Sequence, residues 1–101
     1  MNRFTSRTAV ITGAASGIGR AAAHRFAAEG ARMFLVDRNA DQLPIVASEM
    51  PADSVAGYAV ADLKEVDQAQ GAISRATEAL GGIDVLVNNA GDADVMPFLD
   101  L

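Results

Sequence analysis

The stretch Thr12-Gly13-Ala14-Ala15-Ser16-Gly17-Ile18-Gly19 decides the fold expected for this chain, because it joins two segments of different character. The residues before it, 8–11, form a short apolar run typical of a β-strand, and the residues after it, 18–29, are rich in alanine, as in an α-helix. A strand, a glycine-rich turn and a helix in this order are typical of a phosphate-binding loop. We therefore expect the start of the helix to face the phosphates of a ligand.

Each glycine of this loop has its own expected role. Gly13 lets the chain leave the strand in a conformation that a Cβ would resist, and Gly17 removes side-chain bulk where a pyrophosphate would approach the backbone. Gly19 would let the helix pack closely on the strand. Dinucleotide binding is the first hypothesis, although three glycines within seven residues also occur in an ordinary tight turn.

The spacing of the glycines argues against one alternative phosphate site. It reads G-x-x-x-G-x-G, and no Gly-Lys-Ser/Thr follows, as it would in the P-loop of a nucleoside triphosphatase. Arg20 comes directly after the last glycine, and we expect it to point to solvent from the first turn of the helix.

Composition restricts the remaining classes of function. The 101 residues allow one small domain, and half of them are apolar with few aromatics, which suits close packing of helices on a sheet. A net charge of −5 argues against a nucleic-acid surface, and the absence of cysteine excludes disulfides and thiol catalysis. No apolar run approaches the ~20 residues of a membrane span. We expect a cytoplasmic protein with no metal site and no membrane or nucleic-acid partner.

Strand-like and helix-like segments alternate along the whole chain, with no linker or repeat between them. Such alternation predicts an α/β protein with a parallel sheet. The expected strands are residues 8–11, 33–36, 58–61 and 83–87. The expected helices are residues 18–29, residues 41–50 approximately, and a third helix that ends before residues 81–82.

Apolar residues at helical spacing predict which helix faces are buried. In the first helix the predicted stripe is Ile18, Ala22 and Phe26, with His24 on the opposite, solvated face. In the third helix, apolar residues recur at seven-residue intervals and end before a pair of glycines; they are Val66, Ile73 and Leu80.

Two carboxylates follow predicted strands. Asp37 lies 18 residues after Gly19, close to the offset of the acid that binds an adenosine ribose, where a carboxylate accepts both hydroxyls and repels a 2′-phosphate. It could instead form a turn with Asn39 or cap the next helix. Asp62 begins Asp62-Leu63-Lys64-Glu65, which fits a capping box for the third helix.

Two motifs together resemble one family. Residues 12–19 match the T-G-x-x-x-G-x-G signature of the short-chain dehydrogenases/reductases, and Asn88-Asn89-Ala90-Gly91 matches their N-N-A-G signature at the end of the fourth strand. The resemblance implies a nicotinamide cofactor, NAD in preference to NADP. The residues that it places at the cofactor are Gly13, Ser16, Gly17, Ile18, Gly19, Asp37, Asp62, Leu63, Asn89, Ala90 and Gly91. The two asparagines could equally form a turn that ties neighbouring strands together.

The resemblance covers only the first half of the family's fold. It implies a doubly wound, Rossmann-like parallel sheet with about four strands in the order 3-2-1-4. The family's chemistry needs a Tyr-x-x-x-Lys pair, but no lysine lies four residues after Tyr58, and Lys64 is the only lysine. No catalytic residue is therefore assigned. Residues 94–101 resemble the segment that leads into the family's next helix, so we expect a chain truncated before the catalytic segment, with the fourth strand at a sheet edge.

These expectations leave two classes of function open. In the first, the chain is the NAD-binding half of an oxidoreductase that exchanges hydride with a small alcohol or ketone, and that forms a homo-oligomer. In the second, it is a non-catalytic fragment that binds a nucleotide or acts as an interaction module. A Tyr-x-x-x-Lys motif encoded downstream would favour the enzyme.

Overall fold

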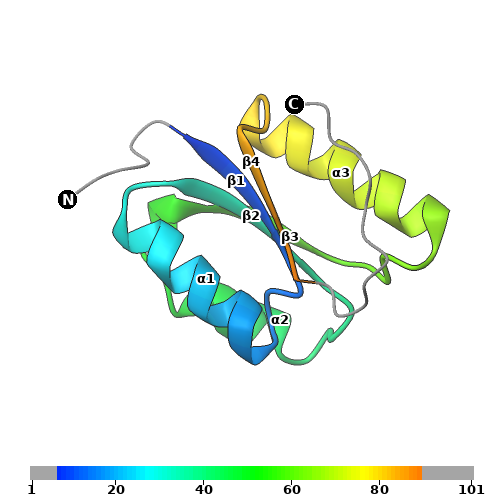
Figure 1. The fold of residues 1–101 in the computed structure, drawn as a ribbon, viewed down its shortest axis with the longest axis horizontal. Helices are drawn as coiled ribbons and strands as arrows, with labels where there is room; N and C mark the ends of the chain where they lie inside the picture. Colours follow the sequence, from blue (N-terminus) through cyan, green and yellow to red (C-terminus); the bar gives the residue numbers. More distant parts are fainter. Residues whose placement is uncertain (1–6, 90–101) are drawn as a thin grey trace.

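The computed structural model describes residues 7–89, which form a four-stranded parallel sheet with helices on both faces (Figure 1). The strand order is β3-β2-β1-β4, which confirms the predicted order 3-2-1-4. The strands are β1 (Thr8–Thr12), β2 (Arg32–Asp37), β3 (Val55–Val60) and β4 (Val85–Asn88). The helices are α1 (Gly17–Ala28), α2 (Leu43–Ser48), the 3-10 helix η1 (Ala52–Ser54) and α3 (Val66–Leu80).

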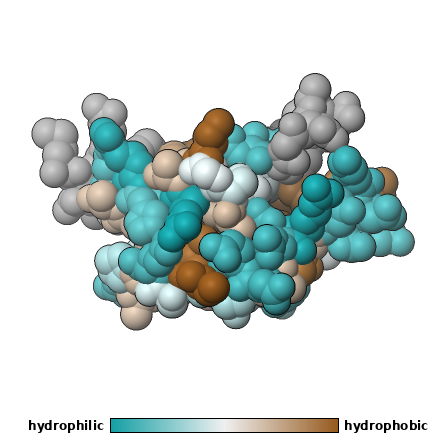
Figure 2. All heavy atoms as spheres, turned by 90° about the horizontal axis from the view of Figure 1, so that it is seen from below, coloured by the Kyte–Doolittle hydropathy of each residue, from teal (hydrophilic) through white to brown (hydrophobic). Residues whose placement is uncertain are grey.

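Two apolar cores lie on opposite faces of the sheet. Ile11 of β1 is buried in the core shared with α1 and α2, whereas its neighbour Val10 is buried in the core under α3. Successive strand residues point to opposite faces, so a central strand covered on both sides is apolar at every position. By contrast, all four residues of β4 are only half-buried, as expected at a sheet edge. The face of the molecule shown in Figure 2 is mostly hydrophilic, and its hydrophobic residues form small separate patches.

The predicted apolar stripes are wrong at the first turn of both long helices. Ile18 is 75% exposed and Val66 is 68% exposed. In a parallel α/β unit the first turn of a helix lies beyond the carboxyl end of the preceding strand, so it has little sheet to pack against. The buried faces consist of small residues instead, Gly19 and Ala23 in α1 and Ala72 and Ala76 with Leu80 in α3.

Some element boundaries also differ from those predicted. β3 begins at Val55, three residues before the predicted start at Tyr58. Val55 and Gly57 pair with Met33 and Phe34 of β2, and Ala56 between them has no partner in the register. Alanine and glycine have low strand propensity, which is why the sequence did not indicate this part of the strand. The Phe34 ring covers Gly57, where an added Cβ would lie 3.1 Å from Cε1. α2 is shorter than residues 41–50, and Pro44 lies in its first turn as the sequence requires.

Candidate cofactor site

The predicted cofactor residues gather at the carboxyl ends of the four parallel strands. The loop after β1, Asp37 at the end of β2, Asp62 after β3 and Asn89 after β4 all lie at this edge of the sheet. In open parallel sheets, ligands bind in the crevice at this edge, where connections lead to opposite faces. The loop after β1 leads to α1 and the segment after β3 leads to α3, which cover opposite faces.

The loop between β1 and α1 is held by its own backbone. Gly13 has φ 62°, in the left-handed region that a side chain disfavours. Its carbonyl accepts hydrogen bonds from the Ser16 N–H at 3.1 Å and from the Ser16 hydroxyl at 2.7 Å. The Ser16 hydroxyl is thus committed as a donor inside the loop, and only its oxygen lone pairs remain for a ligand.

Gly17 and Gly19 differ in the space around them. A Cβ on Gly19 would lie 1.9 Å from the Gly13 carbonyl oxygen, so α1 packs on the loop at a distance that only glycine permits. A Cβ on Gly17 would meet no described heavy atom within 4 Å. The fold itself therefore does not explain a glycine at position 17, whereas a ligand lying over the loop would.

The N-terminus of α1 carries no side-chain cap and no acidic residue in its first turn. Its amide groups consequently face the carboxyl edge without a competing carboxylate.

Arg20 does not simply point to solvent as predicted, because its guanidinium pairs with Glu49 after α2, with Nε 2.9 Å from Oε1. His24 Nε2 lies 2.9 Å from the same oxygen. These two hydrogen bonds hold the pKa of Glu49 below its usual range, and the one from Arg20 has the larger effect.

Asp37 makes the turn that the sequence left as its alternative role, and one further contact. Its Oδ1 accepts the Asn39 N–H at 2.8 Å, and its Oδ2 accepts the Ala15 N–H of the glycine-rich loop at 2.9 Å. Asn39 in turn accepts the N–H groups of Asp41 and Gln42 through Oδ1, so it leads the chain into α2. The carboxylate therefore lies beside the glycine-rich loop.

The predicted capping box at Asp62 is wrong. α3 begins at Val66 after Glu65, and Asp62 instead forms a local turn in which its Oδ1 accepts the Lys64 N–H at 3.0 Å. Gln68 Oε1 accepts the Asp62 N–H at 2.7 Å, a contact that the sequence analysis missed. Leu63 packs against the core under α3. Asp62 remains at the carboxyl edge, because the next residue back, Ala61, donates its N–H to the Asp37 carbonyl at 3.0 Å.

The asparagines at the end of β4 do tie neighbouring strands together. Thr12 is fully buried and pairs with Asn88 in the register of β1 and β4. The Thr12 hydroxyl donates to Asn88 Oδ1 at 3.0 Å and accepts the Asn89 N–H at 2.9 Å. The predicted site residues did not include Thr12. The signal for it in the sequence is a threonine that directly follows an apolar run. Ala90 and Gly91 lie outside the described residues.

Two further observations concern other kinds of site. In residues 7–89 no group of three His, Asp or Glu side chains is arranged to hold a metal ion. None of the helices in this range combines the length and apolar character needed to cross a bilayer.

Comparison with known proteins assigns the fold and its family. The family described as short chain dehydrogenase matches residues 7–101. The chain belongs to the short-chain dehydrogenase family. It is 45% identical over 88 residues to an uncharacterized oxidoreductase of Mycobacterium bovis, an alignment that covers 87% of this chain and 36% of that protein. The chain thus spans about a third of the length of this curated relative.

Solved structures of the family show the same arrangement with different cofactors. A 3-ketoacyl-(acyl-carrier-protein) reductase from Brucella melitensis, complexed with NADH, has a TM-score of 0.82 and 38% identity over 87% of this chain and 36% of its own. The C-domain of a bacterial malonyl-CoA reductase with NADP has a TM-score of 0.83 and 27% identity over 93% of this chain and 16% of its own. These two neighbours thus carry different nicotinamide dinucleotides, NADH in one and NADP in the other.

Proposed function

We propose that this chain is the NAD-binding part of an oxidoreductase that transfers hydride between the cofactor and a small alcohol or ketone. The family supports the reaction class. The bound nicotinamide would supply the hydride chemistry, and the residues of this chain would bind and orient the dinucleotide. The 101 residues contain no Tyr-x-x-x-Lys motif, so the group that exchanges a proton with the substrate belongs to a different segment of the protein.

The observation that carries the proposal is the position of the Asp37 carboxylate beside the glycine-rich loop, with Oδ2 2.9 Å from the Ala15 nitrogen. A ligand whose pyrophosphate lies over Gly17 would bring its adenosine ribose to this carboxylate. A carboxylate accepts hydrogen bonds from both ribose hydroxyls, whereas a 2′-phosphate would lie against its negative charge. The preferred cofactor is therefore NAD(H).

The other residues have roles that follow from their places at the edge of the sheet. Amide groups at the start of α1, near Ile18, would face the pyrophosphate, since Ile18 lies in the exposed first turn. Asp62 and Leu63 would lie along the adenine, and Asn89, Ala90 and Gly91 along the ribose next to the nicotinamide.

The test is a titration of NADH and NADPH against a form of the protein that spans the length of its relatives. We expect NADH to bind at least tenfold more tightly, a difference of about 1.4 kcal/mol or more. Asp37→Ser should reduce this preference by weakening NADH and strengthening NADPH. Equal affinities in the unaltered protein would contradict the proposed role of Asp37.

A further inference from the structure

The backbone pairing between β1 and β2 continues one step beyond the two strands. Thr12 pairs with Val36 at the end of the ladder, and the Ala14 N–H then donates to the Val36 carbonyl at 3.1 Å. At the next residue the main chains no longer pair. Instead, the Ala15 N–H donates to the side chain of Asp37 at 2.9 Å. The Asp37 carboxylate therefore provides the next hydrogen bond between the loop and the end of β2.

Asp37 also contacts the other segments at this edge of the sheet. Its Oδ1 accepts the Asn39 N–H at 2.8 Å in the turn toward α2, and its main-chain carbonyl accepts the Ala61 N–H at 3.0 Å after β3. One residue thus joins the glycine-rich loop, the turn before α2 and the segment that leads to Asp62. The half-buried position of its side chain makes the loss of either partner costly.

The acceptor capacity of the carboxylate allows two roles at once. An ionised carboxylate has about four lone-pair positions, and the two backbone N–H groups use one on each oxygen. Two positions remain, which equals the number of hydroxyls on an adenosine ribose. Binding of the ribose would therefore not require the loop to give up its hydrogen bond.

We propose that Asp37 is a positioning residue that fixes the shape of the glycine-rich loop before any ligand binds, through the hydrogen bond from the Ala15 N–H to its Oδ2. This role is separate from ribose recognition. It has a consequence for the affinity of the cofactor as well, and that consequence rests on the proposed function. Loss of the hydrogen bond would weaken binding even of a cofactor that makes no contact with Asp37, because its pyrophosphate would meet a less ordered loop.

The variant Asp37→Asn discriminates between the two backbone partners. An asparagine has one acceptor oxygen, and asparagine readily forms the local turn to the second residue after it. The amide oxygen should therefore keep the Asn39 N–H, and the Ala15 N–H should lose its acceptor. In the cofactor-free chain we expect amide hydrogen exchange at Ala15 to rise about tenfold or more, with a much smaller change at Asn39.

A matched control lies at the opposite end of β1. Asp84, which precedes β4, accepts the Thr8 N–H of β1 through Oδ2 at 2.9 Å, so Asp84→Asn makes the same chemical change in a carboxylate that accepts a backbone N–H away from the loop. It should leave exchange at Ala15 unaltered. In the unmodified chain, a scalar coupling across the hydrogen bond between the Ala15 nitrogen and the Asp37 carboxylate carbon provides a test that requires no variant to fold. Unchanged exchange at Ala15 in Asp37→Asn, or absence of this coupling, would overturn the proposal.

A binding experiment separates positioning from ribose recognition. The probes are NAD and an NAD analogue whose adenosine ribose lacks the 2′ and 3′ hydroxyls. If Asp37 also positions the loop, Asp37→Asn should weaken the analogue several-fold, although the analogue has no hydroxyl for Asp37 to accept. Equal affinity of the analogue for both forms would contradict the effect on binding. If exchange at Ala15 rises but neither form binds NAD, the proposed function fails and the positioning of the loop stands.

Discussion

The two ends of β1 use the same chemistry for different purposes. At the amino end, the Thr8 hydroxyl donates to the Gly82 carbonyl at 2.7 Å, and Asp84 accepts the Thr8 N–H. At the carboxyl end, the Thr12 hydroxyl donates to Asn88 and accepts the Asn89 N–H. At each end of β1, a threonine thus forms hydrogen bonds with residues in β4 or next to it. This kind of hydrogen bonding by itself therefore does not indicate a binding site.

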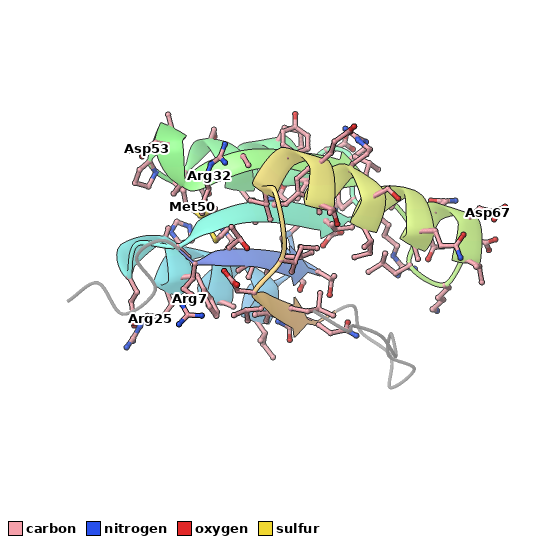
Figure 3. All side chains as sticks on the ribbon, turned by 90° about the horizontal axis from the view of Figure 1, so that it is seen from above. Arg7, Arg25, Arg32, Met50, Asp53 and Asp67 are labelled. Atoms are coloured by element: carbon pink, nitrogen blue, oxygen red, sulfur yellow. The ribbon has the colours of Figure 1, made fainter. Side chains whose placement is uncertain are left out.

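The two ends of β1 differ in the groups that surround these hydrogen bonds. The amino end carries basic side chains such as Arg7, Arg25 and Arg32 (Figure 3). The carboxyl end has the uncapped start of α1 and the open space over Gly17. Arginine side chains are an obvious place to seek an anion site, but the N-terminus of a helix offers backbone N–H groups to an anion as well. The proposed cofactor site therefore depends on available donors and free space and not on formal charge.

The largest expected effect follows from what the carboxyl edge lacks. The 101-residue chain alone should show no NAD-dependent turnover with any alcohol or ketone, because it has no tyrosine and lysine pair to exchange the proton that accompanies hydride transfer. The half-buried edge strand β4 should also make the chain self-associate. An NADH absorbance assay over a substrate panel and light scattering check the two parts. Reproducible turnover, or a stable monomer, would contradict the respective part.

The next prediction concerns the two glycines of the loop. Gly19→Val places a side chain against the Gly13 carbonyl and should lower the free energy of unfolding by about 3 kcal/mol or more. Gly17→Val meets open space, so its effect on stability should be within about 1 kcal/mol, whereas NAD affinity should fall at least tenfold in a form that spans the length of the relatives. Melting curves and titration measure both. Unchanged affinity in a folded Gly17→Val protein would show that the loop is only a structural turn.

The two threonines test the comparison directly. Thr12→Val removes a fully buried hydroxyl and leaves the Asn89 N–H without its acceptor, so we expect a loss of about 1–3 kcal/mol. Thr8→Val removes a half-buried hydroxyl and should cost about 1 kcal/mol or less. Denaturant unfolding measures both costs. Equal costs would mean that burial does not distinguish the two ends.

The sequence predicted the fold wherever local chemistry alone determines the structure. The conformation expected of Gly13 is confirmed by its positive φ, and the parallel sheet expected from the alternation of elements is confirmed as well. It failed where tertiary packing decides. Spacing marked Ile18 and Val66 as buried, but both lie in a first turn beyond the sheet. The capping-box pattern at Asp62 lies about one turn too early, because Asp62 accepts the Lys64 N–H in a local turn and α3 starts only at Val66.

The hydrogen bonds at the carboxyl edge of the sheet also depend on tertiary structure that sequence patterns do not contain. The contact of Asp37 with Ala15 joins residues 22 apart in sequence, and that of Thr12 with Asn89 joins residues 77 apart. Sequence patterns indicated that each residue type was suitable, but only the parallel register brings the partners together. The open space at Gly17 likewise depends on where α1 packs against the loop.

The smallest expected effect comes from the exposed ion pair that joins α1 to the end of α2. The pKa of Glu49 is lowered by Arg20 first and by His24 second, so ionised Glu49 stabilises the folded state at a pH above the usual glutamate pKa of about 4.3. This contribution is lost as the pH falls through the lowered pKa of the folded state. A double-mutant cycle of Arg20→Met and Glu49→Gln should therefore show a larger coupling energy at pH 7 than at pH 2. The pair is exposed, so the coupling should be small and should decrease in high salt. A coupling of the same size at both pH values would show that the two side chains interact through packing and not through charge.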